Sequence, residues 1–170
     1  TPGYPFAPPA VLAGVRWNDN PPFELTKTSM AECAGRTLAL PNFGRCWFAL
    51  FLDGEKRARN GAVLDLKSGS VIMLRSHFGD LQFLHSMAST SQERAGETRD
   101  KILMWAEFAW RTALGEFQGG TRMIETGIPS LKNYFRPGET LQTLFTRGNP
   151  THRSAIGAVA FGSLLHTLHD

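Results

Sequence analysis

The sequence predicts a mainly α protein, a single helical domain with long loops. A chain of 170 residues suits one hydrophobic core, and a hydrophobic fraction of 42% is typical of a folded protein. Apolar residues recur at helical spacing between about Arg99 and Phe117. Asn149 followed by Pro150 is a typical helix start, because proline at the first helical position sacrifices no hydrogen bond. We therefore expect one helical domain over 1–170.

The first half of the chain combines a proline-rich segment with short helices. Proline and aromatic residues crowd 1–22, and since proline removes backbone donors, we expect an extended arm there on the surface. Helices are expected over 24–33 and over 42–52, the second capped by Asn42. The segment 63–74 is compatible with either a small hairpin or an irregular loop.

Stronger helix signals lie in the second half. Asp80 is a candidate cap for a short helix, and a polar loop over 89–98 follows it. Thr98 is a suitable cap for the next helix, which Gly119 and Gly120 would end. The helices expected here cover 80–88, 99–117, 139–146 and 150–170.

Charge and cysteine content restrict the partners and the compartment. Lysine and arginine number 18 against 15 acidic residues, an excess smaller than most nucleic-acid binders carry. The longest apolar run, 46–52, is far too short for a transmembrane segment. Cys33 and Cys46 are compatible with one disulfide or with two buried thiols. The start at Thr1 fits either a removed signal peptide or a cloning boundary, and we expect a secreted or periplasmic protein.

The last helix contains the first candidate metal ligands. His166 and Asp170 are four residues apart, so their side chains lie on one helical face and can bind one cation together. Val159, Gly162 and Ser163 lie on or beside that face one and two turns earlier, where small residues allow another segment to approach closely. The simpler alternative is a helix end whose histidine and aspartate meet only solvent.

A second candidate group lies in the segment RSHFGD over 75–80. His77 has a glycine nearby and is free to point into a cleft, whereas Asp80 is more simply a helix cap. His85 lies on the apolar face of the helix that follows. Such a histidine is more often a core residue than a ligand, but its closeness to His77 makes it a candidate.

The two motifs together, SHFGD and then GSLLHTLHD, resemble the superfamily of zinc-dependent phospholipases C and single-strand-specific nucleases. The resemblance covers two short motifs and the helix between them. It implies a phospholipase C/nuclease-like helical bundle in which His77, His166 and Asp170 bind zinc. The reaction it implies is phosphodiester hydrolysis by a water molecule that zinc activates.

The chain departs from the family's pattern at other ligand positions. The family uses an N-terminal tryptophan amine, whereas Trp17 is internal, and Asp19 is the candidate replacement. Asp65 is the nearest candidate for a bridging aspartate before the SHF segment. Trp17 and Phe78 are candidates for contacting the substrate. The family takes further ligands from beyond the H-x-x-x-D helix, which implies that 1–170 is the N-terminal part of a longer catalytic domain or that a second chain completes the site.

Three functions are compatible with these patterns. The first is a zinc-dependent phospholipase C-like enzyme acting on phospholipids, which the small charge excess and the many aromatic and leucine residues favour. The second is a single-strand-specific nuclease of the same superfamily, for which aromatic residues of the arm, Trp17 among them, would supply base stacking. The third is a non-catalytic helical fragment that works only with a partner chain. Catalytic residues beyond the metal ligands, and the number of metal ions, do not follow from the sequence.

Overall fold

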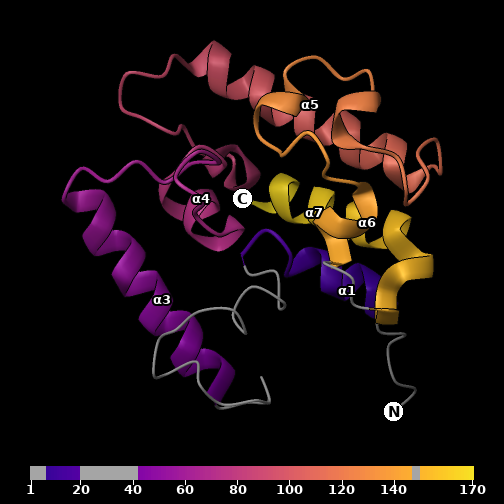
Figure 1. Cartoon of the computed structure of the whole chain (residues 1–170), viewed down its shortest axis with the longest axis horizontal. Helices are drawn as coiled ribbons and strands as arrows, with labels where there is room; N and C mark the ends of the chain where they lie inside the picture. Colours follow the sequence, from indigo (N-terminus) through magenta and orange to yellow (C-terminus); the bar gives the residue numbers. More distant parts are fainter. Residues whose placement is uncertain (1–6, 20–41, 147–149) are drawn as a thin grey trace.

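Helix α7 (Ile156–His169) lies at the centre of the fold, between α5 (Ala95–Ala113) and α1 (Pro9–Val15) (Figure 1). The computed structural model describes residues 7–19, 42–146 and 150–170. Within these ranges the chain is mainly α-helical, which confirms the predicted fold class. The only β pairing in the described part is an isolated bridge between Arg122 and Thr140.

Part of the segment expected to form an extended arm is helical. Pro8 is the N-cap of α1 and Pro9 its first residue. The first backbone N–H groups of a helix have no partner within the helix, so prolines at these positions permit the helix instead of preventing it. The expectation of an extended arm is therefore wrong for residues 9–15. Residues 1–6 and 20–22 of the predicted arm lie outside the described residues.

Two glycines allow α1 and α7 to touch backbone to backbone. A Cβ atom on Gly14 would lie 2.0 Å from the carbonyl oxygen of Val159, and one on Gly162 would lie 2.1 Å from that of Val11. Both distances are far shorter than a van der Waals contact. The small residues of α7 thus admit a neighbouring helix on this face, as the sequence predicts, and that helix is α1.

Trp17 is a core residue, which corrects its assignment to substrate binding. Only 1% of its surface is exposed. Its ring stacks on Trp105 of α5 with centroids 5.6 Å apart, and its indole N–H donates to the carbonyl oxygen of Leu144 at 3.3 Å. A side chain enclosed in this way can contact no substrate. Trp110 of α5, by contrast, is half exposed.

A second, smaller cluster of buried side chains joins α3 (Asn42–Arg59) to α4 (Ile72–Phe78). Helix α3 begins at the predicted residue but is a full two turns longer than predicted. Helix α4 occupies the end of the segment read as a hairpin or loop, so His77 lies in a helix and not in a loop. The 3-10 helix η2 (Gln82–His85) follows directly and carries His85.

The remaining elements follow the prediction with shifted boundaries. Helix α5 begins four residues before the predicted start, so Thr98 is not its cap. Two 3-10 turns, η3 (Met123–Glu125) and η4 (Leu131–Asn133), precede α6 (Leu141–Thr146). The predicted final helix divides into the 3-10 helix η5 (Pro150–Ala155) and α7. The helix predicted over 24–33 lies outside the described residues, and none of the described helices is long and apolar enough to cross a membrane.

Asp80 is an ion-pair partner and not the helix cap that the sequence suggests. Its carboxylate accepts two hydrogen bonds from the guanidinium of Arg75, at 2.8 and 2.9 Å. Arg75 is buried, and it also donates to the carbonyl oxygen of Tyr134 at 2.7 Å. Because Arg75 belongs to α4 and Asp80 precedes η2, this pair fixes the turn between the two candidate ligands His77 and His85.

We expect Asp80→Ala to lower the free energy of unfolding by about 2 kcal/mol, because it leaves a buried guanidinium without its counter-ion. Urea titration followed by circular dichroism measures the effect. The exposed residue Asp100 provides the control: its carboxylate pairs with the adjacent, equally exposed Arg99, so Asp100→Ala should change stability by less than about 0.5 kcal/mol. Equal stabilities for the two variants would contradict a structural role for Asp80.

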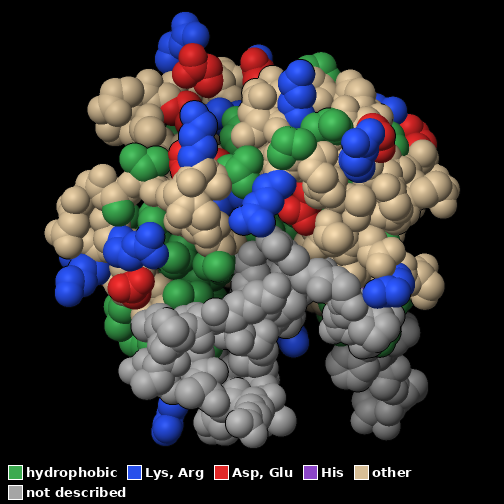
Figure 2. All heavy atoms as spheres, viewed as in Figure 1, with side chains coloured by type: hydrophobic (Ala, Val, Ile, Leu, Met, Phe, Trp, Pro, Cys, Tyr) green, Lys and Arg blue, Asp and Glu red, His purple; other side chains and the backbone are tan. Residues whose placement is uncertain are grey.

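Basic and acidic side chains are interspersed on the face of the molecule shown in Figure 2, over the described residues. The formal net charge of the whole chain is only +3. The described part of this face therefore offers no broad area of one sign for a polyanion to bind (Figure 2).

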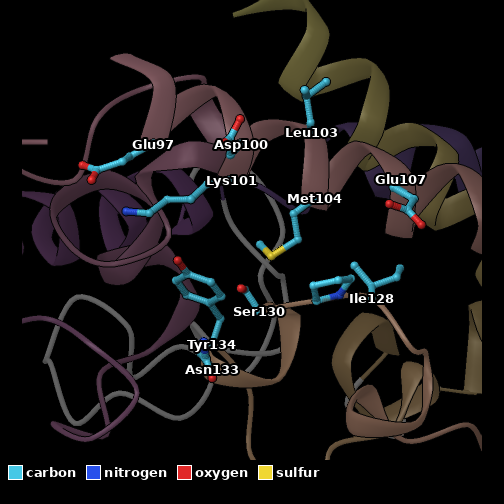
Figure 3. A pocket seen from close by; sticks show the side chains of 11 residues that line it. Glu97, Asp100, Lys101, Leu103, Met104, Glu107, Ile128, Ser130, Asn133 and Tyr134 are labelled. Carbon is cyan, nitrogen blue, oxygen red and sulfur yellow. The ribbon is translucent and has the colours of Figure 1, made fainter. Parts of the chain in front are cut away.

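A cleft of about 530 Å³ lies between α5 and the segment 128–134 (Figure 3). Three carboxylates line it, those of Glu97, Asp100 and Glu107, and each is paired with an arginine of α5 or of its N-cap. Lys101 also lines the cleft and is paired with Glu93 at 2.7 Å. The charged groups of this cleft thus already satisfy one another, and it contains none of the candidate metal ligands.

Candidate metal centre

Three histidines and two aspartates from separate segments meet at one end of the fold. Asp19 follows α1, His77 ends α4, His85 ends η2, and α7 brings His166 and Asp170. The C-terminal end of α7 reaches the region of α4 in Figure 1. The side chains form two groups of three possible ligands, with His85 common to both.

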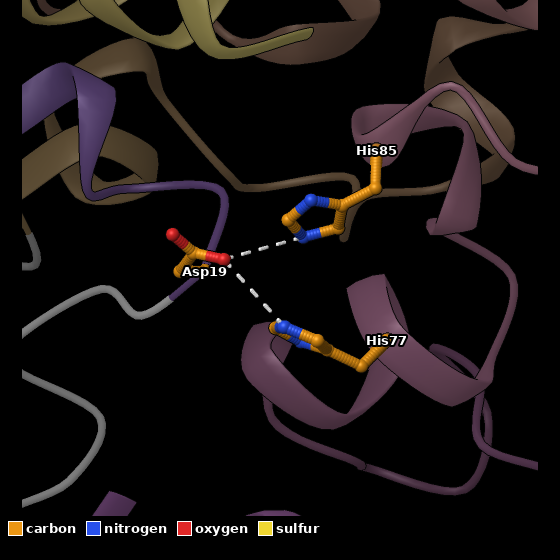
Figure 4. Close-up of side chains that lie close together, drawn as sticks. All are labelled: Asp19, His77 and His85. Carbon is orange, nitrogen blue, oxygen red and sulfur yellow. Dashed lines mark ion pairs between the residues drawn. The ribbon is translucent and has the colours of Figure 1, made fainter. Parts of the chain in front are cut away.

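The first group consists of Asp19, His77 and His85 (Figure 4). The carboxylate oxygen Oδ1 of Asp19 lies 3.6 Å from Nε2 of His77 and 3.9 Å from Nε2 of His85. The imidazole rings of the two histidines have centroids 4.7 Å apart. The two imidazoles are largely withdrawn from solvent, whereas the Asp19 side chain is 46% exposed.

The second group consists of His85, His166 and Asp170, and its atoms lie closer together. Nδ1 of His85 is 2.8 Å from Oδ2 of Asp170 and 3.1 Å from Nε2 of His166. Nε2 of His166 is 3.0 Å from the same carboxylate oxygen, so the predicted i, i+4 pair does share one face. Two ligand atoms at zinc distances and tetrahedral angles are about 3.3 Å apart, so little movement would bring these three to one ion.

Backbone carbonyls determine which nitrogen of His77 and His166 faces the centre. Nδ1–H of His77 donates to the carbonyl oxygen of Met73 at 2.8 Å, and Nδ1–H of His166 donates to that of Val15 at 2.6 Å. A carbonyl oxygen can only accept, so Nδ1 carries the proton in both rings and Nε2 presents a lone pair in the neutral form. A backbone carbonyl on the second nitrogen is a typical partner of a metal-bound histidine.

The first group consists of acceptors that face one another. Nδ1–H of His85 donates to Asp170, which leaves a lone pair on Nε2 of the neutral ring. That Nε2 is buried and has no hydrogen-bond partner among the described residues. The Asp19 carboxylate lies 3.9 Å from this nitrogen, too far for a hydrogen bond, and His77 offers a ligand atom within 4.8 Å. A cation between these three atoms would satisfy them all, so the donor set fits a metal ion such as zinc.

Electrostatics favour the protonation states that a metal requires. Burial lowers the pKa of His85 and outweighs the opposing hydrogen bond to Asp170, and the neighbouring His77 and His166 lower it further. Burial acts to raise the pKa of Asp19, but the contact with His77 and the charges of the surrounding imidazoles hold it below its usual value. A neutral imidazole beside an ionised carboxylate is the form in which both bind metal.

Asp65 is the one predicted ligand that the structure places elsewhere. It belongs to neither group of possible ligands, and its carboxylate accepts a hydrogen bond from the backbone N–H of Ser68 at 2.7 Å. An aspartate that closes a turn onto the residue three positions later serves the local backbone. His169, on the same helix, is 92% exposed, and its Nδ1 lies 4.0 Å from the carboxylate of Asp170.

Aromatic side chains of α3 and α4 border His77. The rings of Trp47 and Phe51 stand edge-on to the His77 imidazole, with centroids 6.0 and 5.3 Å away. Phe78 packs against Phe51 at 4.8 Å and is half-buried. Its predicted contact with substrate stays a prediction. Only the packing of α3 against α4 places Trp47 beside a candidate ligand.

Asn18 was not singled out from the sequence, although it adjoins Asp19. Its side chain is completely buried and bonded to η2 and α7. A single asparagine in the polar segment 18–20 has no pattern that distinguishes it from a turn residue.

The candidate metal centre stands on its geometry alone. Comparison of the chain with protein-family models, with curated proteins and with solved structures found no match.

Proposed function

We propose that this protein is a zinc-dependent hydrolase of phosphodiesters, of the phospholipase C kind. The observation that carries the proposal is the first group of ligands, in which a buried imidazole nitrogen, a second imidazole nitrogen and a carboxylate face one another with no proton to share. Zinc is the metal best suited to a mixed set of imidazole and carboxylate ligands. The order of the SHFGD and HTLHD motifs supports the choice of reaction.

Within this proposal the five side chains would act as ligands. His85 would bind through both ring nitrogens, which requires that an ion in the second group displace its Nδ1 proton, because the neutral ring has only one lone pair. Bound zinc supplies a water ligand with a pKa of about 7 and polarises phosphoryl oxygens. His77 and His166 present Nε2 in fixed orientations because backbone carbonyls hold their Nδ1–H groups. Asp19 and Asp170 offset the metal's charge, and Trp47 and Phe51 cover one side of His77. Their hydrophobic surface would exclude water from that side of the site.

We favour a phospholipid over a single-stranded nucleic acid as the substrate. The formal net charge of the chain is only +3, whereas a nuclease would require a basic groove. Trp17, one of the residues that would stack on bases in a nuclease, is enclosed in the core. The aromatic pair on α3 is compatible with either substrate, so the two must be compared directly.

We also propose a secreted or periplasmic location. Cys46 is disulfide-bonded, and disulfides persist in oxidising compartments. The second cysteine of the chain, Cys33, lies outside the described residues.

Elemental analysis combined with hydrolysis assays tests the proposal. We expect at least one zinc ion per chain, hydrolysis of a phosphatidylcholine substrate, loss of activity with a chelator and recovery on adding zinc. Single-stranded DNA, assayed in parallel, should be cleaved more slowly. Preferential cleavage of DNA would reassign the enzyme as a nuclease. Absence of zinc from protein purified and assayed with zinc present would refute the metal centre, and bound zinc without hydrolysis of either substrate would refute the enzyme.

A further inference from the structure

The side chain of Asn18 lies at the junction of the segments that carry the candidate ligands. It is 0% exposed, and it stands between the core residue Trp17 and the ligand Asp19. Its amide nitrogen lies within hydrogen-bond distance of the carbonyl oxygen of Leu84 at 2.9 Å and the hydroxyl of Thr167 at 3.0 Å. Its amide oxygen accepts a hydrogen bond from the hydroxyl of Ser163.

The backbone of Asn18 makes a further connection. Its carbonyl oxygen accepts a hydrogen bond from the hydroxyl of Ser76 at 2.9 Å. One residue therefore contacts α4 through Ser76, η2 through Leu84 and α7 through Thr167. The carbonyl oxygen of Ser163, which is also in α7, lies 3.2 Å from the amide nitrogen of Asn18.

These contacts fall on the immediate chain neighbours of the histidine ligands. Ser76 precedes His77, Leu84 precedes His85, and Thr167 follows His166. Asn18 itself precedes Asp19. We infer that Asn18 is the positioning residue of the metal centre, which holds four ligands from four separate segments at one spacing. The inference rests on the proposed metal site and assigns a role to a residue that binds no metal itself.

The chemistry of the primary amide explains why asparagine suits this position. The planar group offers two N–H donors and one acceptor oxygen in fixed directions. The donors lie within reach of the Leu84 carbonyl on η2 and of the Ser163 carbonyl and the Thr167 hydroxyl on α7, and the oxygen accepts from the Ser163 hydroxyl. A metal site requires its ligands to lie within about 0.5 Å of the productive geometry. The chain segments that separate these ligands are too long to hold them at that precision, so direct contacts between the segments are needed. Loss of the amide would leave the buried carbonyl of Ser163 without this donor and would free the Asp19 segment from α7.

Zinc affinity of a pair of variants tests the inference. Asn18→Ala should weaken zinc binding about 10- to 100-fold, the usual effect of losing a partner that orients ligands. It should also change the visible absorption spectrum of the cobalt-substituted protein, because the ligand geometry changes. Competition with a chelator of known affinity measures binding, at a temperature where circular dichroism shows the variant to be folded.

A second variant keeps the test decisive if Asn18→Ala fails to fold. Thr167→Val preserves shape but removes the hydroxyl that contacts Asn18 and Leu84, and it should weaken zinc binding at least several-fold. Thr112→Val is the matched control, since Thr112 is equally buried and its hydroxyl bonds the carbonyl four residues earlier on α5, away from Asn18. This control should bind zinc as the unmodified protein does.

The outcomes separate this inference from the proposed function. If the unmodified protein binds no zinc, the metal centre itself is refuted. A second outcome is that the unmodified protein binds zinc and His166→Ala abolishes this binding. If Thr167→Val and every folded Asn18→Ala sample then bind zinc with unchanged affinity and unchanged cobalt spectra, the positioning role of Asn18 is wrong. Equal loss of affinity in Thr167→Val and Thr112→Val would also overturn it, because general destabilisation would then explain the effect.

Discussion

Replacing His166 by alanine is expected to abolish stoichiometric zinc binding in the group that it forms with His85 and Asp170, and hydrolysis with it. The substitution removes a ligand nitrogen that lies 3.0 Å from the Asp170 carboxylate and 3.1 Å from His85. Loss of a ligand should exceed the roughly 10- to 100-fold effect of losing a partner that only orients one. Zinc content after dialysis and the rate of phosphatidylcholine hydrolysis measure the two effects.

Two companion variants show whether the loss comes from the metal or from the fold. His169→Ala changes a 92% exposed histidine on the same helix and should leave zinc content and activity unchanged. His166→Asn retains an N–H donor for the Val15 carbonyl but removes Nε2, so it should keep the fold and still lose zinc. Full activity of His166→Ala in the presence of zinc would refute His166 as a ligand of the catalytic metal.

Gly162→Ala is expected to be strongly destabilising, with a loss of about 3 kcal/mol or more in the free energy of unfolding. The new Cβ would lie 2.1 Å from the carbonyl oxygen of Val11 and 2.7 Å from the backbone nitrogen of Val15. Backbone atoms cannot rotate away, so α1 must move off α7. The carbonyl oxygen of Val15, in α1, accepts the hydrogen bond that orients His166, and Asp19 follows the same helix. Movement of α1 would therefore displace two ligands, and zinc affinity should fall together with stability.

Gly96→Ala provides the control for this prediction. Gly96 lies in the first turn of α5, and a Cβ there would meet nothing within 4 Å. Alanine at this helical position should leave stability unchanged or raise it by up to about 1 kcal/mol. Thermal unfolding should separate the two variants by about 6 °C or more for a chain of this length. A Gly162→Ala protein as stable as the unmodified chain would show that α1 does not pack on α7 in this way.

Local patterns were sufficient for features that depend on neighbours in the chain. The i, i+4 spacing places His166 and Asp170 on one helical face, and the structure has their side chains 3.0 Å apart. The small residues of the same helix predict a close neighbour, which the glycine contacts of α1 confirm. Helical periodicity likewise locates α5, with an error of a few residues at each end.

Features that depend on packing between distant segments were predicted poorly. The prolines before α1 suggested an extended arm because the sequence does not show whether a proline precedes a helix or interrupts it. Asp65 and Asp19 are both aspartates in polar segments, and only tertiary contacts show that one closes a turn while the other faces two imidazoles. His85 could not be distinguished from a core histidine until its Nε2 was seen to lack a hydrogen-bond partner among the described residues.

The amino-acid sequence by itself determined the helical character of this protein and the one-turn pairing of an imidazole with a carboxylate, because both follow from the periodicity of a single helix. Only the tertiary structure decided which side chains from other segments join that pair. Their proximity depends on the glycine contact of α1 with α7 and on the hydrogen bonds of Asn18, which span up to 149 positions of the chain. No local pattern encodes a contact at that separation.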